Sequence, residues 1–245
     1  VPILEEIGSL NLLNLEQLKH LVDAPVYQID SEVNEAIIPF EKLEPLPVVQ
    51  IKVNSKTMFV FLDTGAAQLI IDSDYAKENN IEPMSERAVK GAAGGKEAWA
   101  AFGKVESIAL GDITVANVPV WMAKLRALCD DIDFGVPING VLGTELLIQF
   151  LPTLDFPRSR MVLRVRNDEN AKQVMNMKAK AKIPFIIDGI HCMYAQCSVN
   201  KQGPVLMYFD SGLADACAHY LMQDYAAAVP ILEEIGSLNL LNLEQ

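Results

Sequence analysis

The sequence predicts a mainly β protein. Through the middle of the chain, short runs of Val, Ile, Leu and Phe are separated at regular intervals by turn residues, a pattern that is typical of all-β domains. Apolar residues make up 51% of the 245 residues. This content is ample for a buried core in one large or two small domains.

The elements of the central block are expected in a regular order. Strands at 48–53 and 57–62 flank the turn Asn54-Ser55-Lys56 and form a hairpin. Further strands are predicted at 69–71, 105–110, 115–122 and 161–165, with short helices at 73–80 and 141–150. A glycine cluster between two strand-like segments predicts a hairpin tip, because glycine tolerates any backbone angle there. The cluster consists of Gly91, Ala92, Ala93, Gly94 and Gly95.

The two ends of the chain are predicted to be helical. Residues 1–45 form one such segment, which the breaker Pro45-Leu46-Pro47 ends. Residues 1–17 recur letter for letter at 229–245, which indicates a second copy of one segment rather than a diverged repeat. A helical segment is therefore expected at 218–245. This segment weakly resembles a tetratricopeptide-type helix. We favour amphipathic helical packing over peptide binding as its role.

The rest of the chain is expected to divide into a lobe, a linker and part of a second lobe. The lobe covers 46–166, and a basic linker covers 167–182. Eight of the 20 basic residues lie between Arg158 and Lys182, which is typical of a solvated connection. Residues 183–217 form the partial second lobe, with strands at 183–187 and 191–199 and a further strand that leads to Asp210.

The charge and the apolar pattern argue against some classes of partner. Acidic residues exceed basic ones by 32 to 20, which gives a net charge of −12. Nucleic acids and anionic membranes bind basic surfaces, so neither is expected as a general partner. The chain has no run of about 18 apolar residues, so no membrane-spanning helix is expected.

The cysteines were considered as metal ligands and as disulfides. Four cysteines in a chain of this size do not form a disulfide framework. Three of them lie near two histidines, namely Cys192, Cys197 and Cys217 near His191 and His219. Their spacing matches no standard zinc pattern, and apolar neighbours favour buried thiols, so we expect neither a metal nor a cofactor.

The compartment cannot be read from these cysteines. The start at Val1 in place of Met is compatible with a lost signal peptide. For a bacterial chain we therefore favour the periplasm or secretion over the cytoplasm.

Two segments of the chain place an aspartate at the end of an apolar strand. Asp63 follows Phe59–Leu62, and Gly65 comes two positions later; Asp210 and Gly212 repeat this arrangement after the apolar run at 205–209. One such turn is usually only a turn. Two of them in one chain can bring together two carboxylates that share a proton and activate water for attack on a peptide bond.

Three features after the first turn strengthen this interpretation. They are the glycine-rich hairpin, the step Val141-Leu142-Gly143 before a helix, and a strand-turn-strand at 151–163. With these features in this order, residues 46–166 resemble a retropepsin-type aspartic protease domain of the kind found in bacterial aspartyl proteases. The resemblance implies a closed β lobe of the acid protease fold, with Asp63 as catalytic carboxylate and Gly91–Gly95 as the flap. It also implies that Gly143 belongs to the step that supports the active-site loop.

The resemblance further implies hydroxyl groups that bond across to the partner lobe, and Thr64 and Ser211 supply them. Gly65 and Gly212 let backbone N–H groups approach the carboxylates. The chain departs from the two-lobed pattern after Gly212, where no second flap or second apolar step follows before the duplicated segment. Asp210 is therefore either the intramolecular partner of Asp63, which we favour, or structural, with Asp63 paired to its own copy in a homodimer.

The predicted function is that of an aspartic-type endopeptidase. The dyad titrates as a unit, so its ionised member removes a proton from water while the protonated member binds the scissile carbonyl. The expected substrate is an extended polypeptide with apolar residues around the cut. The alternative is a non-catalytic module that binds peptides or proteins through a protease-like lobe and a helical adaptor.

Overall fold

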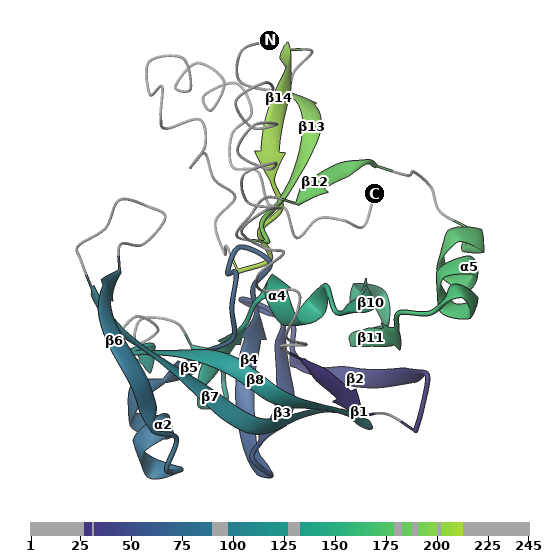
Figure 1. Cartoon of the computed structure of the whole chain (residues 1–245). Helices are drawn as coiled ribbons and strands as arrows, with labels where there is room; N and C mark the ends of the chain where they lie inside the picture. The colour runs from purple at the N-terminus through teal and green to yellow at the C-terminus, as the bar shows by residue number, and fades with distance from the viewer. Residues whose placement is uncertain are drawn as a thin grey trace, which may run out of the picture.

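The computed structural model describes residues 27–30, 32–89, 98–126, 133–178, 183–187, 191–199 and 202–212. They form a large sheet and a separate three-stranded sheet (Figure 1). The strands of the large sheet are β1 (Gln28–Asp30), β2 (Glu35–Lys42), β3 (Val48–Val53), β4 (Lys56–Leu62), β5 (Ile70–Asp72), β6 (Pro83–Val89), β7 (Ala98–Leu110), β8 (Ile113–Ala123), β9 (Gly140–Leu142), β10 (Phe150–Asp155) and β11 (Arg160–Val165). The small sheet holds β12 (Phe185–Ile187), β13 (Met193–Val199) and β14 (Gln202–Tyr208).

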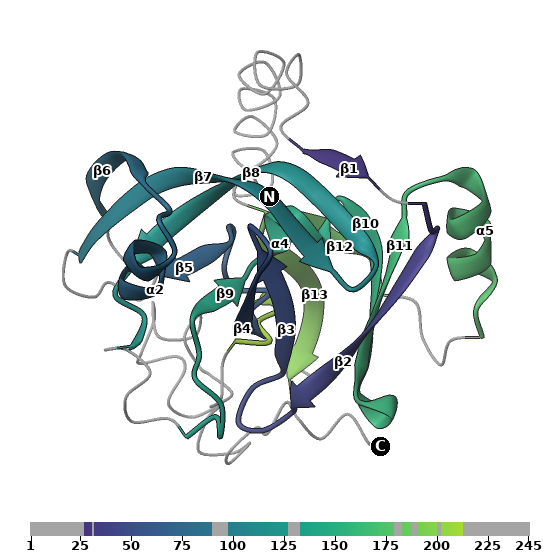
Figure 2. The same cartoon turned by 90° about the horizontal axis from the view of Figure 1, so that it is seen from below.

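Part of the large sheet closes into a barrel. The order of pairing runs β3-β4-β9-β5-β8-β7, and β7 pairs back onto β3. Figure 2 shows these strands curving around a common interior. The fold is therefore mainly β with a closed lobe, and the predicted fold class is confirmed.

The hairpin of β3 and β4 illustrates how the sequence sets this fold. In β3 the side chains alternate between buried and exposed from Val49 onward, as expected for a strand with one face in the core. The turn residues Asn54 and Ser55 both have positive φ, 46° and 68°, a combination that suits the right-handed twist of a hairpin. The Asn54 side chain also accepts hydrogen bonds from the backbone of Glu106 and Ser107 at 2.9 and 3.1 Å, which anchors the hairpin to β7.

The core fills the interior of the barrel. Its largest fully buried side chains come from most of the barrel strands and include Ile51, Met58, Leu62, Ile71 and Leu142. A smaller apolar cluster lies on the opposite face of β4, where Phe61 stacks on Phe134 with ring centroids 5.8 Å apart. The strand that leads to Asp63 is thus packed on both faces, which makes it a rigid support.

The N-terminal region differs from the expected helical segment. Residues 28–30 and 35–42 are strands, and β2 alternates between exposed residues and the buried Ala36, Ile38 and Phe40. This strand pairs with β3 on one side and with β11 on the other. Its period of two residues fits a sheet with one buried face and does not fit a helix. Residues 1–26 and 213–245, with both copies of the repeat and the tetratricopeptide-like stretch, lie outside the described residues.

The helices in the part of the chain that the structure describes are short. They are α2 (Ser73–Glu78), α4 (Thr144–Leu147), the 3-10 turn η1 (Phe156–Arg158) and α5 (Asp168–Asn176). The helix expected at 141–150 was too long, because Gly140–Leu142 pairs as β9 between β4 and β5 and Phe150 begins β10. Part of the expected linker at 167–182 is helical, since the Asn167 side chain caps α5 by accepting from the backbone N–H of Asn170 at 2.8 Å.

The three-stranded sheet of β12, β13 and β14 stands at one end of the barrel, near α4 (Figure 1). All three residues of β12 are exposed. The last strand, β14, ends at Tyr208, two residues before Asp210. This sheet therefore carries the second aspartate to the end of the barrel strand β4.

Candidate active site

Asp63 stands where β4 leaves the barrel. β4 and β9 run parallel, with Leu62 opposite Leu142, and the backbone N–H of Asp63 donates to the carbonyl of Leu142 at 3.0 Å. The chain then turns, and the N–H of Ala66 donates to the carbonyl of Asp63 at 3.2 Å. The position of this aspartate is therefore set by barrel strands and a tight turn.

Both aspartates are held by the glycine turns that follow them. The N–H groups of Gly65 and Ala66 donate to Oδ1 of Asp63 at 2.7 and 3.0 Å. In the second turn the N–H of Gly212 donates to Oδ1 of Asp210 at 2.8 Å. The bonds from Gly65 and Ala66 favour the ionised form of Asp63.

The two turns are locked together by reciprocal hydrogen bonds. Thr64 Oγ1 donates to the carbonyl of Phe209 at 2.9 Å, and Ser211 Oγ donates to the carbonyl of Leu62 at 2.9 Å. Each hydroxyl also accepts from the backbone N–H of the other residue, both at 3.0 Å. Through these four hydrogen bonds the two turns form a nearly symmetric pair.

The glycines allow the two carboxyl groups to meet. A Cβ atom on Gly65 would lie 2.5 Å from Cγ of Asp210, and a Cβ atom on Gly212 would lie 2.2 Å from Cγ of Asp63. Each carboxyl group thus packs against the bare Cα of the opposite turn. A side chain at either position would occupy the space that the opposite carboxyl needs.

The environment of the pair favours a proton on Asp63. Burial raises the pKa of Asp63 most, the charge of Asp210 and a side-chain hydrogen bond with it raise it further, and the N–H groups of Gly65 and Ala66 lower it. The result is a pKa of about 7 in place of 3.8. Two carboxyl groups that share one site behave in this way because both cannot ionise easily together.

Gly143 lies against the first turn. A Cβ atom on Gly143 would come within 2.3 Å of the carbonyl oxygen of Gln68 and 2.7 Å of that of Ala66. The next residue, Thr144, donates to the carbonyl of Ala66 through its N–H at 2.9 Å and its hydroxyl at 3.1 Å. The start of α4 therefore buttresses the loop that carries Asp63.

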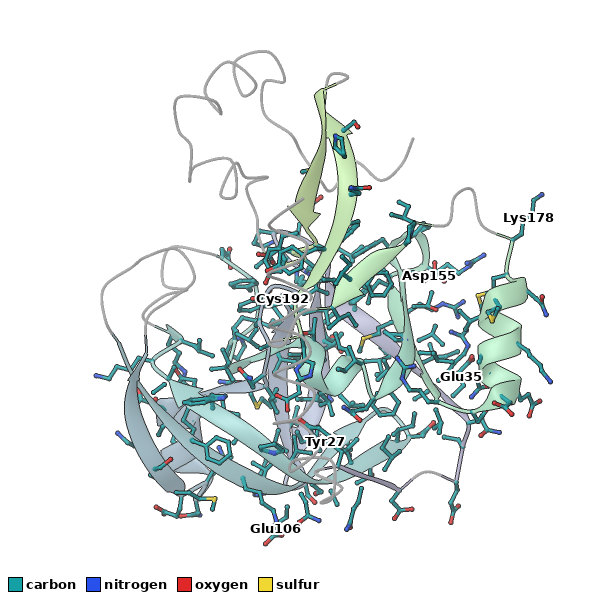
Figure 3. All side chains as sticks on the ribbon, turned by 45° about the horizontal axis from the view of Figure 1, so that its top comes forward. Tyr27, Glu35, Glu106, Asp155, Lys178 and Cys192 are labelled. Atoms are coloured by element: carbon teal, nitrogen blue, oxygen red, sulfur yellow. The ribbon has the colours of Figure 1, made fainter. Side chains whose placement is uncertain are left out.

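The sequence analysis missed two residues that contact the first turn. The hydroxyl of Tyr208 donates to the carbonyl of Gly65, and Sγ of Cys192 lies 3.0 Å from this hydroxyl. Cys192 is buried and lies where the small sheet meets the barrel, as Figure 3 shows. The one signal in the sequence was the difference between Phe61 and Tyr208, which occupy equivalent positions two residues before each aspartate.

The remaining candidates from the sequence are a glycine cluster and several cysteines and histidines. The glycine cluster Gly91–Gly95 lies outside the described residues, as do Cys129, Cys217 and His219. Within the part of the chain that the structure describes, no group of three or more Asp, Glu, His and Cys side chains could hold a metal. No helix of that part is both long and apolar enough to span a membrane.

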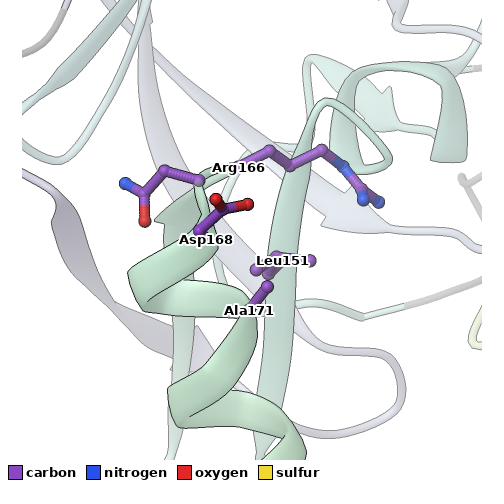
Figure 4. Close-up of a pocket in the computed structure, with 5 residues that line it drawn as sticks. Leu151, Arg166, Asp168 and Ala171 are labelled. Atoms are coloured by element: carbon purple, nitrogen blue, oxygen red, sulfur yellow. The ribbon is translucent and has the colours of Figure 1, made fainter.

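A surface pocket of about 280 Å³ lies apart from the two aspartates. It is lined by Leu151, Arg166, Asn167, Asp168 and Ala171 (Figure 4). Leu151 lies on β10, Asp168 and Ala171 lie on α5, and the other two residues lie between β11 and α5. The guanidinium of Arg166 donates to the carbonyl of Ile148 at 2.6 Å. Asn167, which lines the pocket, is the N-cap of α5. The lining therefore serves to begin a helix and does not form a set of reacting groups.

Comparisons with known proteins agree with the geometry. Residues 49–146 match the model of a family described as aspartyl protease. The chain resembles the retropepsin-like aspartyl proteases. This bears out the resemblance seen in the sequence for the β lobe and supports an aspartic protease activity. None of the curated proteins matches the chain.

Two of the solved structures that match this chain are named as proteases. A retropepsin-like aspartic protease from Rickettsia conorii is 18% identical, and the match covers 57% of this chain and 93% of that chain with a TM-score of 0.40. The EIAV protease complexed with the inhibitor HBY-793 is also 18% identical, with 44% and 90% covered and a TM-score of 0.31.

Proposed function

We propose that the protein is an aspartic endopeptidase whose dyad consists of Asp63 and Asp210 of the same chain. The observation that carries this proposal is the reciprocal set of hydrogen bonds between Thr64 and Ser211, which lie directly after the two aspartates. The match of residues 49–146 to aspartyl proteases supports the same reaction class. The polypeptide substrate, the dyad and its mechanism are part of the proposal.

The two carboxyl groups take different roles. Asp63, with its pKa raised to about 7, carries the shared proton and donates it to the oxygen of the scissile carbonyl. Asp210 is the ionised partner and removes a proton from the attacking water. The N–H groups of Gly65 and Ala66 then stabilise the negative charge that Asp63 acquires in the tetrahedral intermediate. The nucleophile is water, so the scheme has no covalent intermediate.

The substrate is an extended polypeptide with apolar residues around the cut. An extended segment can add strand-like hydrogen bonds to a protease lobe. We propose the glycine cluster Gly91–Gly95 as the flap that covers the substrate and excludes water.

The Asp63–Asp210 pair distinguishes this proposal from a homodimer of single lobes. In the homodimer, Asp63 would face the Asp63 of a second copy. Here the carboxyl of Asp210 fills the space next to Gly65, which supports the intramolecular pair. The mass of the active species in solution tests this point: a monomer is expected, whereas activity confined to a dimer would favour the alternative.

Cleavage of an unstructured polypeptide between pH 3 and 8 tests the function. We expect the wild-type protein to cleave it and a statine-type inhibitor to block cleavage, while Asp63→Asn and Asp210→Asn each abolish it. Asp155→Asn is the matched control, because this carboxyl binds Arg158 and Arg160 in ion pairs away from the dyad. Unchanged cleavage by Asp63→Asn would remove this residue from the mechanism. A wild-type protein that binds the polypeptide without cleaving it would favour the non-catalytic binding module.

A further inference from the structure

The dyad is nearly symmetric, but one contact breaks the symmetry. Tyr208 lies two residues before Asp210, and its hydroxyl crosses to the first turn and donates to the carbonyl of Gly65. The equivalent residue two positions before Asp63 is Phe61, which has no hydroxyl and stacks on Phe134. Phe61 therefore cannot donate an equivalent hydrogen bond to the second aspartate turn. The asymmetry between the two turns follows from the difference between these two side chains.

The contacted carbonyl belongs to a peptide bond that already holds Asp63. The carbonyl of Gly65 and the N–H of Ala66 are the two polar groups of one planar peptide unit. The N–H of Ala66 donates to Oδ1 of Asp63 at 3.0 Å. A hydrogen bond to the carbonyl fixes the plane of this unit and polarises it, which strengthens the N–H as a donor. Tyr208 thus reaches the Asp63 carboxyl through a single peptide group.

Cys192 extends the chain of hydrogen bonds on the other side. Its Sγ atom lies 3.0 Å from the Tyr208 hydroxyl and 3.9 Å from the carbonyl of Gly65. A phenol has one proton to donate. Tyr208 gives that proton to Gly65, while in its contact with the thiol either atom can be the donor. Burial, the contact with Cys192 and the charges of the two aspartates all raise the pKa of the Tyr208 phenol, so it remains a donor across the working pH range.

We propose that Tyr208, supported by Cys192, is a positioning residue that aligns and polarises the Gly65–Ala66 peptide group against the Asp63 carboxyl. The consequence rests on the proposed function. When Asp63 gives its proton to the scissile carbonyl, its new charge is stabilised by the aligned N–H of Ala66. Tyr208 therefore supports the chemical step rather than substrate binding, and it lowers the pH at which Asp63 loses its proton.

The test uses Tyr208→Phe, with Tyr194→Phe as the matched control. Tyr194 lies on β13, and its ring centroid is 5.2 Å from that of Tyr208, so both variants remove one hydroxyl from the same sheet. For Tyr208→Phe we expect kcat to fall about fivefold with KM unchanged, as for one lost hydrogen bond. The alkaline limb of the kcat profile should move up by about half a pH unit, because the ionised form of Asp63 has lost part of its stabilisation. A fall in kcat without a move of this limb, or an equal effect of Tyr194→Phe, would overturn the proposal.

The cysteine provides a second, milder test. Cys192→Ala removes the hydrogen-bond partner of Tyr208 and should move the limb in the same direction by a smaller amount. Cys192→Ser keeps a hydrogen-bonding group and should retain the wild-type profile. Cys197→Ala, a thiol on the same sheet, should have no effect. If Cys192→Ala shifts the profile and Cys192→Ser shifts it equally, the hydrogen-bond role of the thiol is contradicted.

A titration of the carboxyl carbons by NMR separates this inference from the peptidase assignment. The Asp63 signal is identified by its loss in Asp63→Asn, and its pKa is measured in the wild type and in Tyr208→Phe. A higher pKa in Tyr208→Phe supports the positioning role even if the wild-type protein cleaves nothing, a result that would contradict the peptidase proposal alone. An unchanged pKa overturns the positioning role whatever the activity.

Discussion

Asp63→Asn is expected to be more stable than the wild-type protein above pH 7, although it is expected to be inactive. The folded protein holds the Asp63 proton up to about pH 7, whereas the unfolded chain loses it near pH 3.8. Between these values the folded state binds more protons, so stability falls as pH rises. Asparagine does not titrate and avoids this loss. Its Oδ1 can still accept from Gly65 and Ala66, and its amide can donate to Asp210.

The size of the effect follows from the two pKa values. The difference between about 7 and 3.8 corresponds to about 4 kcal/mol at ~1.36 kcal/mol per pKa unit. Asp63 is only partly shielded from solvent, and water reduces the cost of its charge, so we expect about 2 kcal/mol in the free energy of unfolding. The advantage of Asp63→Asn should be small near pH 4, grow toward pH 7 and stay constant above it.

Urea unfolding of both proteins at a series of pH values from 4 to 8 measures this difference. Asp155→Asn serves as a control of opposite sign. A hydrogen bond from Arg160, together with the hydrogen bond and charge of Arg158, lowers the pKa of Asp155, so its contribution is present at neutral pH and is lost as pH falls. An Asp63→Asn variant that is equally destabilised at pH 4 and pH 8 would refute the shared, buried proton and with it the assigned roles of the dyad.

Three further substitutions test how the site is assembled. Gly212→Ala places a Cβ atom 2.2 Å from Cγ of Asp63. The Asp63 carboxyl must then move by about 1 Å, so kcat/KM should fall about a hundredfold. The midpoint of urea unfolding should change little. Thr64→Val removes the hydroxyl bond to the other turn, so unfolding should be easier by about 1–3 kcal/mol, whereas Thr64→Ser should behave like the wild type in the same assay. Gly143→Ala drives a Cβ atom to 2.3 Å from the backbone carbonyl of Gln68, which cannot retreat easily, so both activity and thermal midpoint should fall.

Local features of the site could be predicted from the sequence. The strand before Asp63 and the hairpin turn at Asn54 follow from alternation and turn residues, whereas the supporting position of Gly143 was implied by the resemblance to retropepsin-type proteases. Each of these signals spans only a few neighbouring residues. The structure places the strand and the turn where they were expected, with β4 beginning one residue earlier, at Lys56.

Features set by distant partners could not be predicted. In β2 the apolar Ile37 and Pro39 lie between Ala36, Ile38 and Phe40, which hides the alternation and lets a helical pattern fit as well. Only the pairing with β11, more than a hundred residues later, decides in favour of a strand.

The contact of Tyr208 with Gly65 likewise depends on a partner that is distant in the sequence. It joins residues 143 positions apart, and the one local signal, Tyr208 where the first half has Phe61, does not identify Gly65 as the partner.

The small sheet is joined to the barrel by the bonds that assemble the candidate dyad. Among its described residues, few are buried, namely Cys192 and Ala195, while Phe185, Ile186 and Ile187 on β12 are exposed. The hydroxyl and amide bonds between the aspartate turns therefore carry much of the association, and each contributes only about 1 kcal/mol net. A ligand that contacts both carboxyl groups binds the docked state alone and stabilises it by mass action. Substrate binding and the assembly of the dyad are then one linked equilibrium, so a substitution that removes the hydroxyl of Thr64 or Ser211, which bonds the two turns, should raise KM as well as lower kcat.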